Sequence, residues 1–194
     1  MKAVVVIALA LVVAGCASSE RFLWEEYTNE GLAAFRAGQF NRAESYLSRA
    51  AEKADELGPV EMGRSLNNLG ELNRRRAQTA SGAERRARAA EAERLFRRSL
   101  AVKETAIGPD SPDVATTLNN LAQLYADQGR VQDAMPLLER SLAIQEKTFD
   151  PEHPALGRTL RGLAAVYRAL GRDHDAFVLE TRAHLLRDIE APGD

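Results

Sequence analysis

Apolar residues in the middle of the chain recur at spacings that place them on one side of a helix. Leu118, Leu121 and Tyr125 follow one another at intervals of three and four positions. This spacing predicts an amphipathic helix with one buried face. After a short turn, Ala134 and Leu138 continue the apolar pattern on a second helix. The pattern therefore predicts a helix-turn-helix unit.

The same unit recurs farther along the chain at a fixed distance. Six residues of the first copy reappear unchanged 42 positions later. The earlier set is Leu118, Leu121, Tyr125, Gly129, Arg130 and Ala134, and the later set is Leu160, Leu163, Tyr167, Gly171, Arg172 and Ala176. Recurrence at a fixed period marks a stacked repeat, in which each unit buries its apolar face against its neighbours.

Two further features identify the kind of repeat. The order Leu118-x2-Leu121-Ala122-x2-Tyr125, followed by Ala134-x3-Leu138, has tetratricopeptide spacing. The run Leu-Asn-Asn-Leu-Ala and the link Asp-Pro-Glu-His-Pro resemble the 42-residue form found in kinesin light chains and many bacterial proteins. The resemblance implies an all-α fold, a right-handed superhelical stack of about four helix-turn-helix repeats. It implies a scaffold that binds proteins, without saying which ones.

The expected repeat domain covers residues 22–190 and is followed by a short tail, 191–194. Gly38 should end the first helix of the first repeat, since glycine adopts the left-handed conformation found there. The small residues Gly31 and Ala43 should let the two helices of that repeat approach closely. Proline follows a capping residue where the third repeat begins, and the Asp-Pro-Glu-His-Pro link should begin the fourth repeat in the same way. The repeats are expected at about residues 25–57, 60–107, 112–149 and 154–190.

The N-terminus has the pattern of a targeting segment. Lys2 precedes an unbroken apolar run from Ala3 to Ala14, which is too short to cross a bilayer but suits a secretory signal peptide over residues 1–15. The sequence Val13-Ala14-Gly15-Cys16 resembles the bacterial lipobox. The resemblance implies cleavage before Cys16 and acylation of its thiol. The alternative is an ordinary signal peptide that ends at a cysteine by chance.

Cys16 is the single cysteine, so no internal disulfide is possible. Residues 16–21 would form a lipidated tether, in which the four residues 18–21 span about 14 Å if they are extended. The residues Ala17 and Ser18 stand where an Asp would resemble an inner-membrane retention signal. We therefore expect a bacterial cell-envelope protein that is lipid-anchored in the outer membrane and faces the periplasm.

The second repeat carries an insertion between its two helices. Leu69 and Ala92 are 23 residues apart, whereas their counterparts in the third repeat are 13 apart. Ser81 and Glu84 have capping-box spacing, which predicts a second helix from Gly82 to Ile107 in an overlong, projecting hairpin. The insertion is either a solvated face with internal ion pairs or a basic knob for anionic lipid headgroups or an acidic partner. Its arginines are Arg74, Arg75, Arg76, Arg85, Arg86 and Arg88.

The resemblance implies that the first helix of each repeat lines a concave groove. Asn29, Asn68 and Asn120 align with the asparagine that commonly bonds a bound peptide backbone in this family. The arginines favour an extended ligand with carboxylates, through forked hydrogen bonds. In the alternative, the asparagines only bridge adjacent helices. The candidate groove residues are Asn29, Arg64, Asn67, Asn68, Glu71, Asn119, Asn120, Gln123, Arg158, Arg161 and Arg168.

Composition and motifs argue against chemistry. The formal net charge of -2 provides no field that recruits nucleic acid. His153 falls in a turn between repeats, where capping is expected, and His174 and His184 lie ten residues apart without zinc-site spacing. No glycine-rich phosphate loop or nucleophile elbow occurs. We expect a protein that is not an enzyme and has no metal, no cofactor and no small-molecule substrate.

The sequence thus favours a membrane-anchored adaptor that holds a peptide or helix of another envelope protein in its groove. Lipoproteins of similar architecture include secretin pilotins and factors that organise peptidoglycan enzymes. The first alternative is a fixed structural subunit of an envelope assembly, such as a secretion, pilus or peptidoglycan-enzyme complex. A weaker alternative is an accessory role in an enzyme complex.

Overall fold

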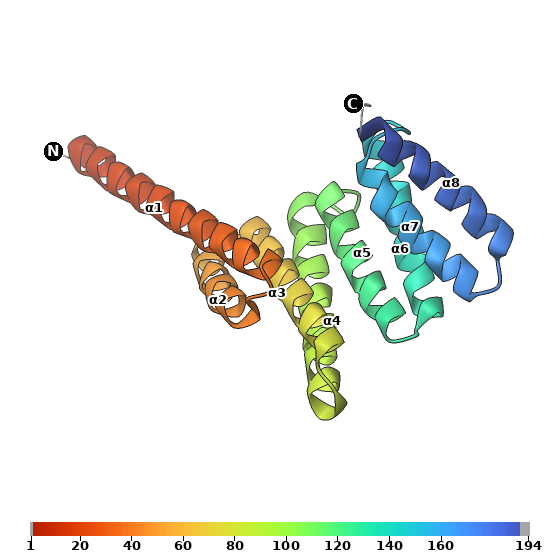
Figure 1. The fold of residues 1–194 in the computed structure, drawn as a ribbon. Coiled ribbons are helices and arrows are strands. Elements are labelled where there is room, and N and C mark those ends of the chain that lie inside the picture. The colour runs from red at the N-terminus through yellow and green to blue at the C-terminus, as the bar shows by residue number, and fades with distance from the viewer. Residues whose placement is uncertain (1, 191–194) are drawn as a thin grey trace.

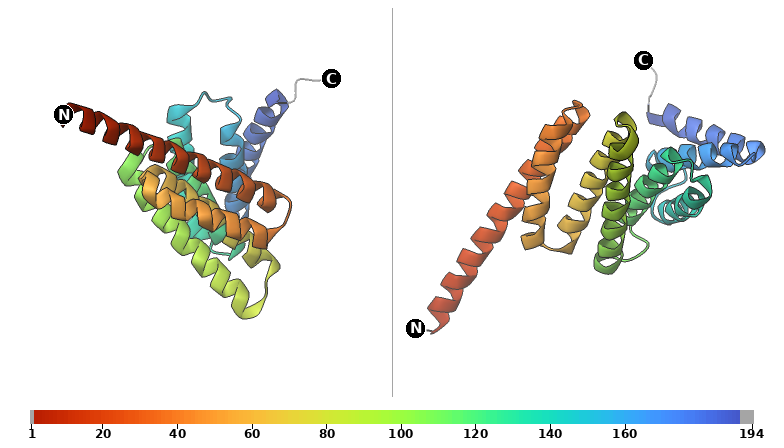
Figure 2. Two further views of the ribbon diagram at one scale, coloured as in Figure 1. Left: turned by 90° about the vertical axis from the view of Figure 1, so that its left-hand side faces the viewer. Right: turned by 90° about the horizontal axis from the view of Figure 1, so that it is seen from below.

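The computed structural model describes the backbone of residues 2–190 and the side chains of residues 19–186. Within these limits all regular structure is helical, as eight helices packed in antiparallel pairs (Figure 1). The pairs stand side by side in chain order, and each helix packs on the next (Figure 2). The helices are α1 (Lys2–Arg36), α2 (Phe40–Leu57), α3 (Pro59–Thr79), α4 (Gly82–Ile107), α5 (Pro112–Asp127), α6 (Val131–Thr148), α7 (Ala155–Ala169) and α8 (Asp173–Glu190).

The main core runs through three pairs rather than lying inside one. Phe96 of α4, Leu121 of α5 and Leu163 of α7 belong to one buried cluster. Leucines 42 positions apart are buried to the same degree: Leu118 and Leu160 are both fully buried. Because the apolar face of one pair is covered by the next, the pairs stabilise one another as a stack. The predicted all-α stack of four helix pairs is confirmed.

Local sequence explains the tight packing and the corner of the first pair. A Cβ atom added at Gly31 would lie 2.7 Å from the Leu47 side chain, so only glycine allows α1 and α2 to approach this closely. Gly38 has a φ of +71°, the left-handed value that lets the chain leave α1 and enter α2. Both predictions for this pair are confirmed.

The predicted helix starts are confirmed in part. Ser111 caps α5 by accepting a hydrogen bond from the Val114 amide, and Pro112 follows at the first helical position. Helix α4 begins at Gly82 as predicted, but the side chain of Ser81 makes no capping bond, so the capping box is wrong. The link before α7 also differs, since Pro154 stands at the cap position itself and the His153 ring accepts the Ala155 amide instead.

Helix α1 corrects the expectation of an extended tether. Residues 18–21 are helical and continue directly into the first pair, because no proline or glycine interrupts them. Trp24 is buried and donates its indole N–H to Ser65 of α3 at 2.9 Å, whereas Phe22 is exposed. No helix in the described part of the chain meets the length and hydropathy of a membrane span. The side chain of Cys16 lies outside the described residues, as does the tail 191–194.

The second pair is longer than the third. Helices α3 and α4 have 21 and 26 residues, whereas α5 and α6 have 16 and 18. The extra turns lie at the corner of the hairpin, which projects beyond its neighbours (Figure 1). The predicted overlong hairpin is therefore present. At the C-terminal end of the stack, α8 exposes the apolar side chains of Phe177, Val178 and Leu185.

Candidate docking surface on the concave face

The first helices of the pairs form the inner wall of the stack. Helices α1 and α3, α3 and α5, and α5 and α7 contact one another across the pair between them. Among the described residues, the second helices make no such contacts with each other. Because only the first helices contact one another across the pairs, the stack bends toward their side. Helices α1, α3, α5 and α7 therefore lie on its concave face. The candidate groove residues all belong to these four helices.

Buried asparagines connect three of these helices. The Asn120 amide donates a hydrogen bond of 2.9 Å to the amide oxygen of Asn67. The Asn120 oxygen in turn accepts one of 2.8 Å from the Arg158 guanidinium. On the same helix, Asn119 donates one of 2.7 Å to the Thr159 hydroxyl. These five residues form a polar ladder across α3, α5 and α7. The asparagines of the ladder bridge adjacent helices, as in the alternative given by the sequence.

Ion pairs strengthen the same wall. Arg74 is 5% exposed and contacts Glu71 at 2.7 Å and Asp127 of the next pair at 2.5 Å. Burial lowers the pKa of this guanidinium, but its hydrogen bonds to the two carboxylates outweigh burial and raise it. Arg64 contacts Asp113 of α5 at 3.0 Å. Side chains from different repeats therefore connect successive helices of the wall.

Three candidate groove residues remain available for a ligand. The side chains of Asn29, Asn68 and Arg161 have no hydrogen bond or ion pair to any described residue. Asn29 and Arg161 are exposed, and Asn68 is half-buried. The other candidates are partly or wholly engaged, as with Gln123, which donates to Asp127 at 3.2 Å. The structure thus separates the candidates into wall-forming residues and unpartnered ones.

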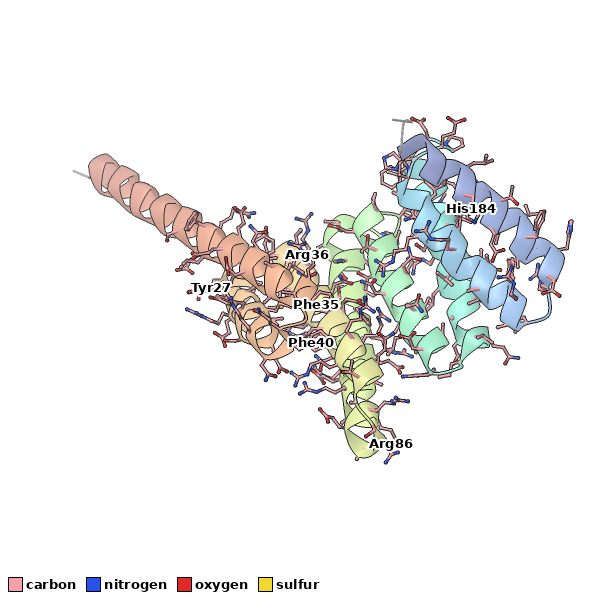
Figure 3. The ribbon with its side chains drawn as sticks, viewed as in Figure 1. Tyr27, Phe35, Arg36, Phe40, Arg86 and His184 are labelled. Atoms are coloured by element: carbon pink, nitrogen blue, oxygen red, sulfur yellow. The ribbon has the colours of Figure 1, made fainter. Side chains whose placement is uncertain are left out.

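Arg168 and the histidines lie toward the end of the stack. Arg168 forms a bidentate pair with Glu180 of α8 at 2.5 and 2.6 Å. This pair holds the pKa of the Glu180 carboxyl below its usual value. His174 and His184 are exposed on α8, with His184 marked in Figure 3. No group of three potential metal ligands occurs among the described residues.

The basic insertion is partly neutralised by neighbours. Arg76 and Arg88 both contact Glu44 of α2, and Arg88 also donates to Asn73. Arg85 donates only to the Ala80 carbonyl. Arg75 is exposed and contacts Gln78 at 3.3 Å and, more distantly, Glu71 at 3.8 Å. Arg86 lies at the hairpin tip and has no polar partner in the described part of the chain (Figure 3).

Sequence reasoning did not identify the acidic partners or one buried cation. Glu44 and Asp127 stand 32 and 53 residues from the arginines Arg76 and Arg74 that they contact, so no local spacing indicates the pairs. Lys103 of α4 is 2% exposed and donates to the Thr117 hydroxyl at 2.9 Å. Burial lowers its pKa to about 8. The only available signal was the 42-residue period, which places Lys103 at the position that Gln145 occupies in the next repeat.

Comparison with known proteins agrees with this architecture. The chain is similar to the crystal structure of BtubC (BKLC) from P. vanneervenii, with a TM-score of 0.70 and 24% identity over 90% of this chain and 67% of that one. It is also similar to a kinesin-light-chain-type protein of Podosopora anserina with nearly identical TPR-like repeats, with a TM-score of 0.61 and 23% identity over 88% and 77% of the two chains. These likenesses concern the fold.

Sequence comparison gives the family itself. No curated protein matches this chain. The Tetratricopeptide repeat family matches residues 80–147 and 113–184, which together make up more than half of the sequence. Members of this family are typically non-catalytic and bind other proteins. The chain belongs to the tetratricopeptide repeat family.

Proposed function

We propose that this protein is a scaffold of the bacterial envelope that holds an extended segment of a partner protein against its concave face. The observation that carries the proposal is the set of unpartnered side chains Asn29, Asn68 and Arg161 on the helices of that face, of which Arg161 also lines a hollow beside α8. They come from α1, α3 and α7, so a segment crossing the stack would meet them in turn.

The rest of the wall supports binding by connecting the helices that carry Asn68 and Arg161. The polar ladder and the pair between Arg74 and Asp127 connect successive repeats, so a ligand need not order the wall when it binds. Preorganisation of this kind lowers the entropy cost of association. In this proposal Asn67, Asn119 and Asn120 do not bond the ligand, and they contribute by holding α3, α5 and α7 together.

The free groups favour a particular ligand chemistry. An asparagine amide donates and accepts, so Asn29 and Asn68 can each bond both polar groups of an extended peptide backbone. Arg161 offers a planar fork that fits a carboxylate. The proposed ligand is thus an extended peptide segment with at least one acidic side chain or a free C-terminus near α7.

We further propose that Cys16 is acylated and anchors the protein in the outer membrane, facing the periplasm. The support is the run Val13-Ala14-Gly15-Cys16 after an apolar segment, together with Ala17 and Ser18 in place of Asp. A single acyl chain holds a protein only marginally, whereas two or more hold it stably. The change Cys16→Ser should therefore block maturation and abolish labelling with a fatty-acid analogue. Continued labelling of that variant would refute the anchor.

The groove is tested with variants of its free residues. Asn68→Ala with Arg161→Ala should weaken crosslinking to the partner in native envelopes by the equivalent of about 1–3 kcal/mol. The melting temperature should stay unchanged, because neither side chain bonds a described residue. Arg98→Ala is the matched control, since Arg98 is exposed on α4, a second helix. Normal crosslinking by the double variant would place the ligand elsewhere.

The alternative function is a fixed subunit of an envelope assembly. The observation that favours it is the exposed apolar side of α8, where Phe177 is 65% and Leu185 61% exposed. Exposed apolar patches commonly mark contacts with other proteins. One partner recovered at constant stoichiometry would support this role. Several partners whose amounts vary with growth conditions would support the adaptor.

A further inference from the structure

The long second pair forms a cleft beside the shorter third pair. Helix α3 continues past the level at which α5 ends, and α4 begins earlier than α6, so part of the hairpin has no neighbour on that side. The hollow has a volume of about 660 Å³. We call it the step cleft. Leu124 of α5 and Ala77 and Ala89 of the hairpin give it an apolar floor.

Charges around the step cleft are not balanced within the chain. Its two carboxylates are already neutralised: Asp127 by Arg74, and Glu93 by hydrogen bonds from Tyr125 and ion pairs with other arginines. Burial raises and the hydrogen bond from Tyr125 lowers the pKa of Glu93, with a net lowering, so this group stays ionised.

The arginines on the rim of the cleft lack such partners. Arg85 donates only to a backbone carbonyl, and Arg86 contacts no carboxylate among the described residues. Glu84 lies nearby in sequence but lines the hollow on the other side of the hairpin. The cleft therefore combines an apolar floor with two unpaired guanidinium groups.

The position of the hairpin distinguishes between two anionic partners. Helix α1 ends at the corner 37–39, which lies at the same edge of the stack as the hairpin corner, and its N-terminal end leaves from the opposite edge (Figure 1). Along α1, Cys16 lies about 30 Å from that corner, at 1.5 Å per residue. Charge interactions are screened within about 8 Å at physiological salt. A bilayer that meets α1 at Cys16 and lies across the helix axis would thus be out of reach of Arg85 and Arg86.

We infer that the step cleft is a second docking site, which binds an acidic segment of a partner protein by placing small apolar side chains on Leu124 and carboxylates on Arg85 and Arg86. A concave floor suits a protein segment better than a flat headgroup layer. Exclusion of the anchoring bilayer rests on the proposed role of Cys16. The cleft itself does not. It borders the concave wall at Arg74 and Asp127, but none of the three unpartnered groove residues lines it.

The test uses the purified full chain and a fluorescein-labelled peptide of alternating alanine and glutamate. Binding is followed by fluorescence anisotropy, and the same peptide with glutamine in place of glutamate is the charge control. We expect Arg85→Glu with Arg86→Glu to weaken binding tenfold or more, and Arg98→Glu to weaken it little. Equal losses in the two variants would show a general charge effect and overturn the inference.

A second pair of variants tests the cleft rather than the charge. Ala90→Phe fills the cleft, because Ala90 lines it and is exposed, whereas Ala87→Phe changes an exposed residue of the same helix that does not line it. We expect only Ala90→Phe to abolish peptide binding, with both variants folded by circular dichroism. Unchanged binding by Ala90→Phe would overturn the inference. So would binding to phosphatidylglycerol vesicles that requires Arg85 and Arg86 when the peptide does not bind. Loss of acylation at Cys16 leaves this assay unaffected.

Discussion

The second and third helix pairs have the same inner plan but different outer ends. Both carry the run Leu-Asn-Asn-Leu on their first helix. In both, the hydroxyl of an equivalent serine is buried and donates to the carbonyl of an equivalent residue, at 2.6 Å for Ser99 and 2.9 Å for Ser141. Near the corner the two pairs diverge, because the second pair has extra turns with a cluster of arginines. The repeat thus conserves its packing near the links and varies its charge near the corner.

Two residue exchanges show how the packing is kept constant. Phe96 of the second pair takes the position of Leu138 in the third, and Gly70 takes that of Ala122. A Cβ atom added at Gly70 would lie 2.6 Å from the Phe96 ring. A larger side chain on one helix is therefore compensated by a smaller one on its partner, as dense packing requires.

The largest expected effect comes from removing the Phe96 side chain. Phe96→Ala should lower the free energy of unfolding by about 3–5 kcal/mol, because Phe96 is fully buried in the core that joins three pairs. Leu138→Ala, the matched change in the third pair, should cost about 2–5 kcal/mol. Urea unfolding of both variants measures the difference. A loss of less than about 2 kcal/mol in either variant would contradict the burial of that residue in the shared core.

The second prediction concerns pH. Below about pH 8, both the folded and the unfolded chain keep the proton of Lys103, and the folded chain carries the full cost of the buried charge. Between about pH 8 and pH 10.5 only the folded chain loses this proton. Raising the pH through this range should therefore raise the free energy of unfolding, by on the order of 3 kcal/mol in total. Arg64 of α3 also lowers this pKa, whereas Asp113 of α5 raises it.

Lys103→Gln is the matched variant, because Gln145 occupies the same position in the third pair and bonds the equivalent threonine and carbonyl. The rise with pH should disappear in this variant. Melting curves from pH 7 to pH 10.5 provide the measurement. An equal rise in both proteins would assign the pH dependence to other groups.

The third prediction exchanges the packing pair itself. Gly70→Ala should lower the free energy of unfolding by about 1–3 kcal/mol, because the new methyl group displaces the Phe96 ring. Adding Phe96→Leu recreates the arrangement of Ala122 and Leu138 and should restore part of the loss. A double-mutant cycle by chemical denaturation measures this coupling. Additive costs would contradict the proposed compensation.

The smallest effects are expected at the exposed arginines of the second pair. Arg75→Ala and Arg86→Ala should each change the free energy of unfolding by less than about 0.5 kcal/mol, since exposed charges contribute little to stability. Thermal denaturation at two salt concentrations checks this. A large loss would show that the corner is needed for folding and is not free to bind a partner.

The sequence alone determined the local features of this protein. Leu118, Leu121 and Tyr125 share one helix face because of their spacing, and Gly38 and Ser111 act within one turn of their own positions. The period of 42 residues placed equivalent positions in equivalent surroundings, so the helix pairs and the long corner could be predicted. The helical backbone of residues 18–21 was missed, because a weak local signal does not decide between extended and helical backbone. The spacing of Ser81 and Glu84 also did not decide whether the Ser81 side chain makes a capping bond, and it makes none.

Only the tertiary structure decided which polar groups are used and which are free. Asn120 and Asn68 belong to the same motif, yet one bridges α3 and α7 while the other has no partner among the described residues. The difference depends on the angle between successive pairs, which brings together residues 38 to 53 positions apart. No local spacing encodes that angle, because it results from the packing of the whole stack.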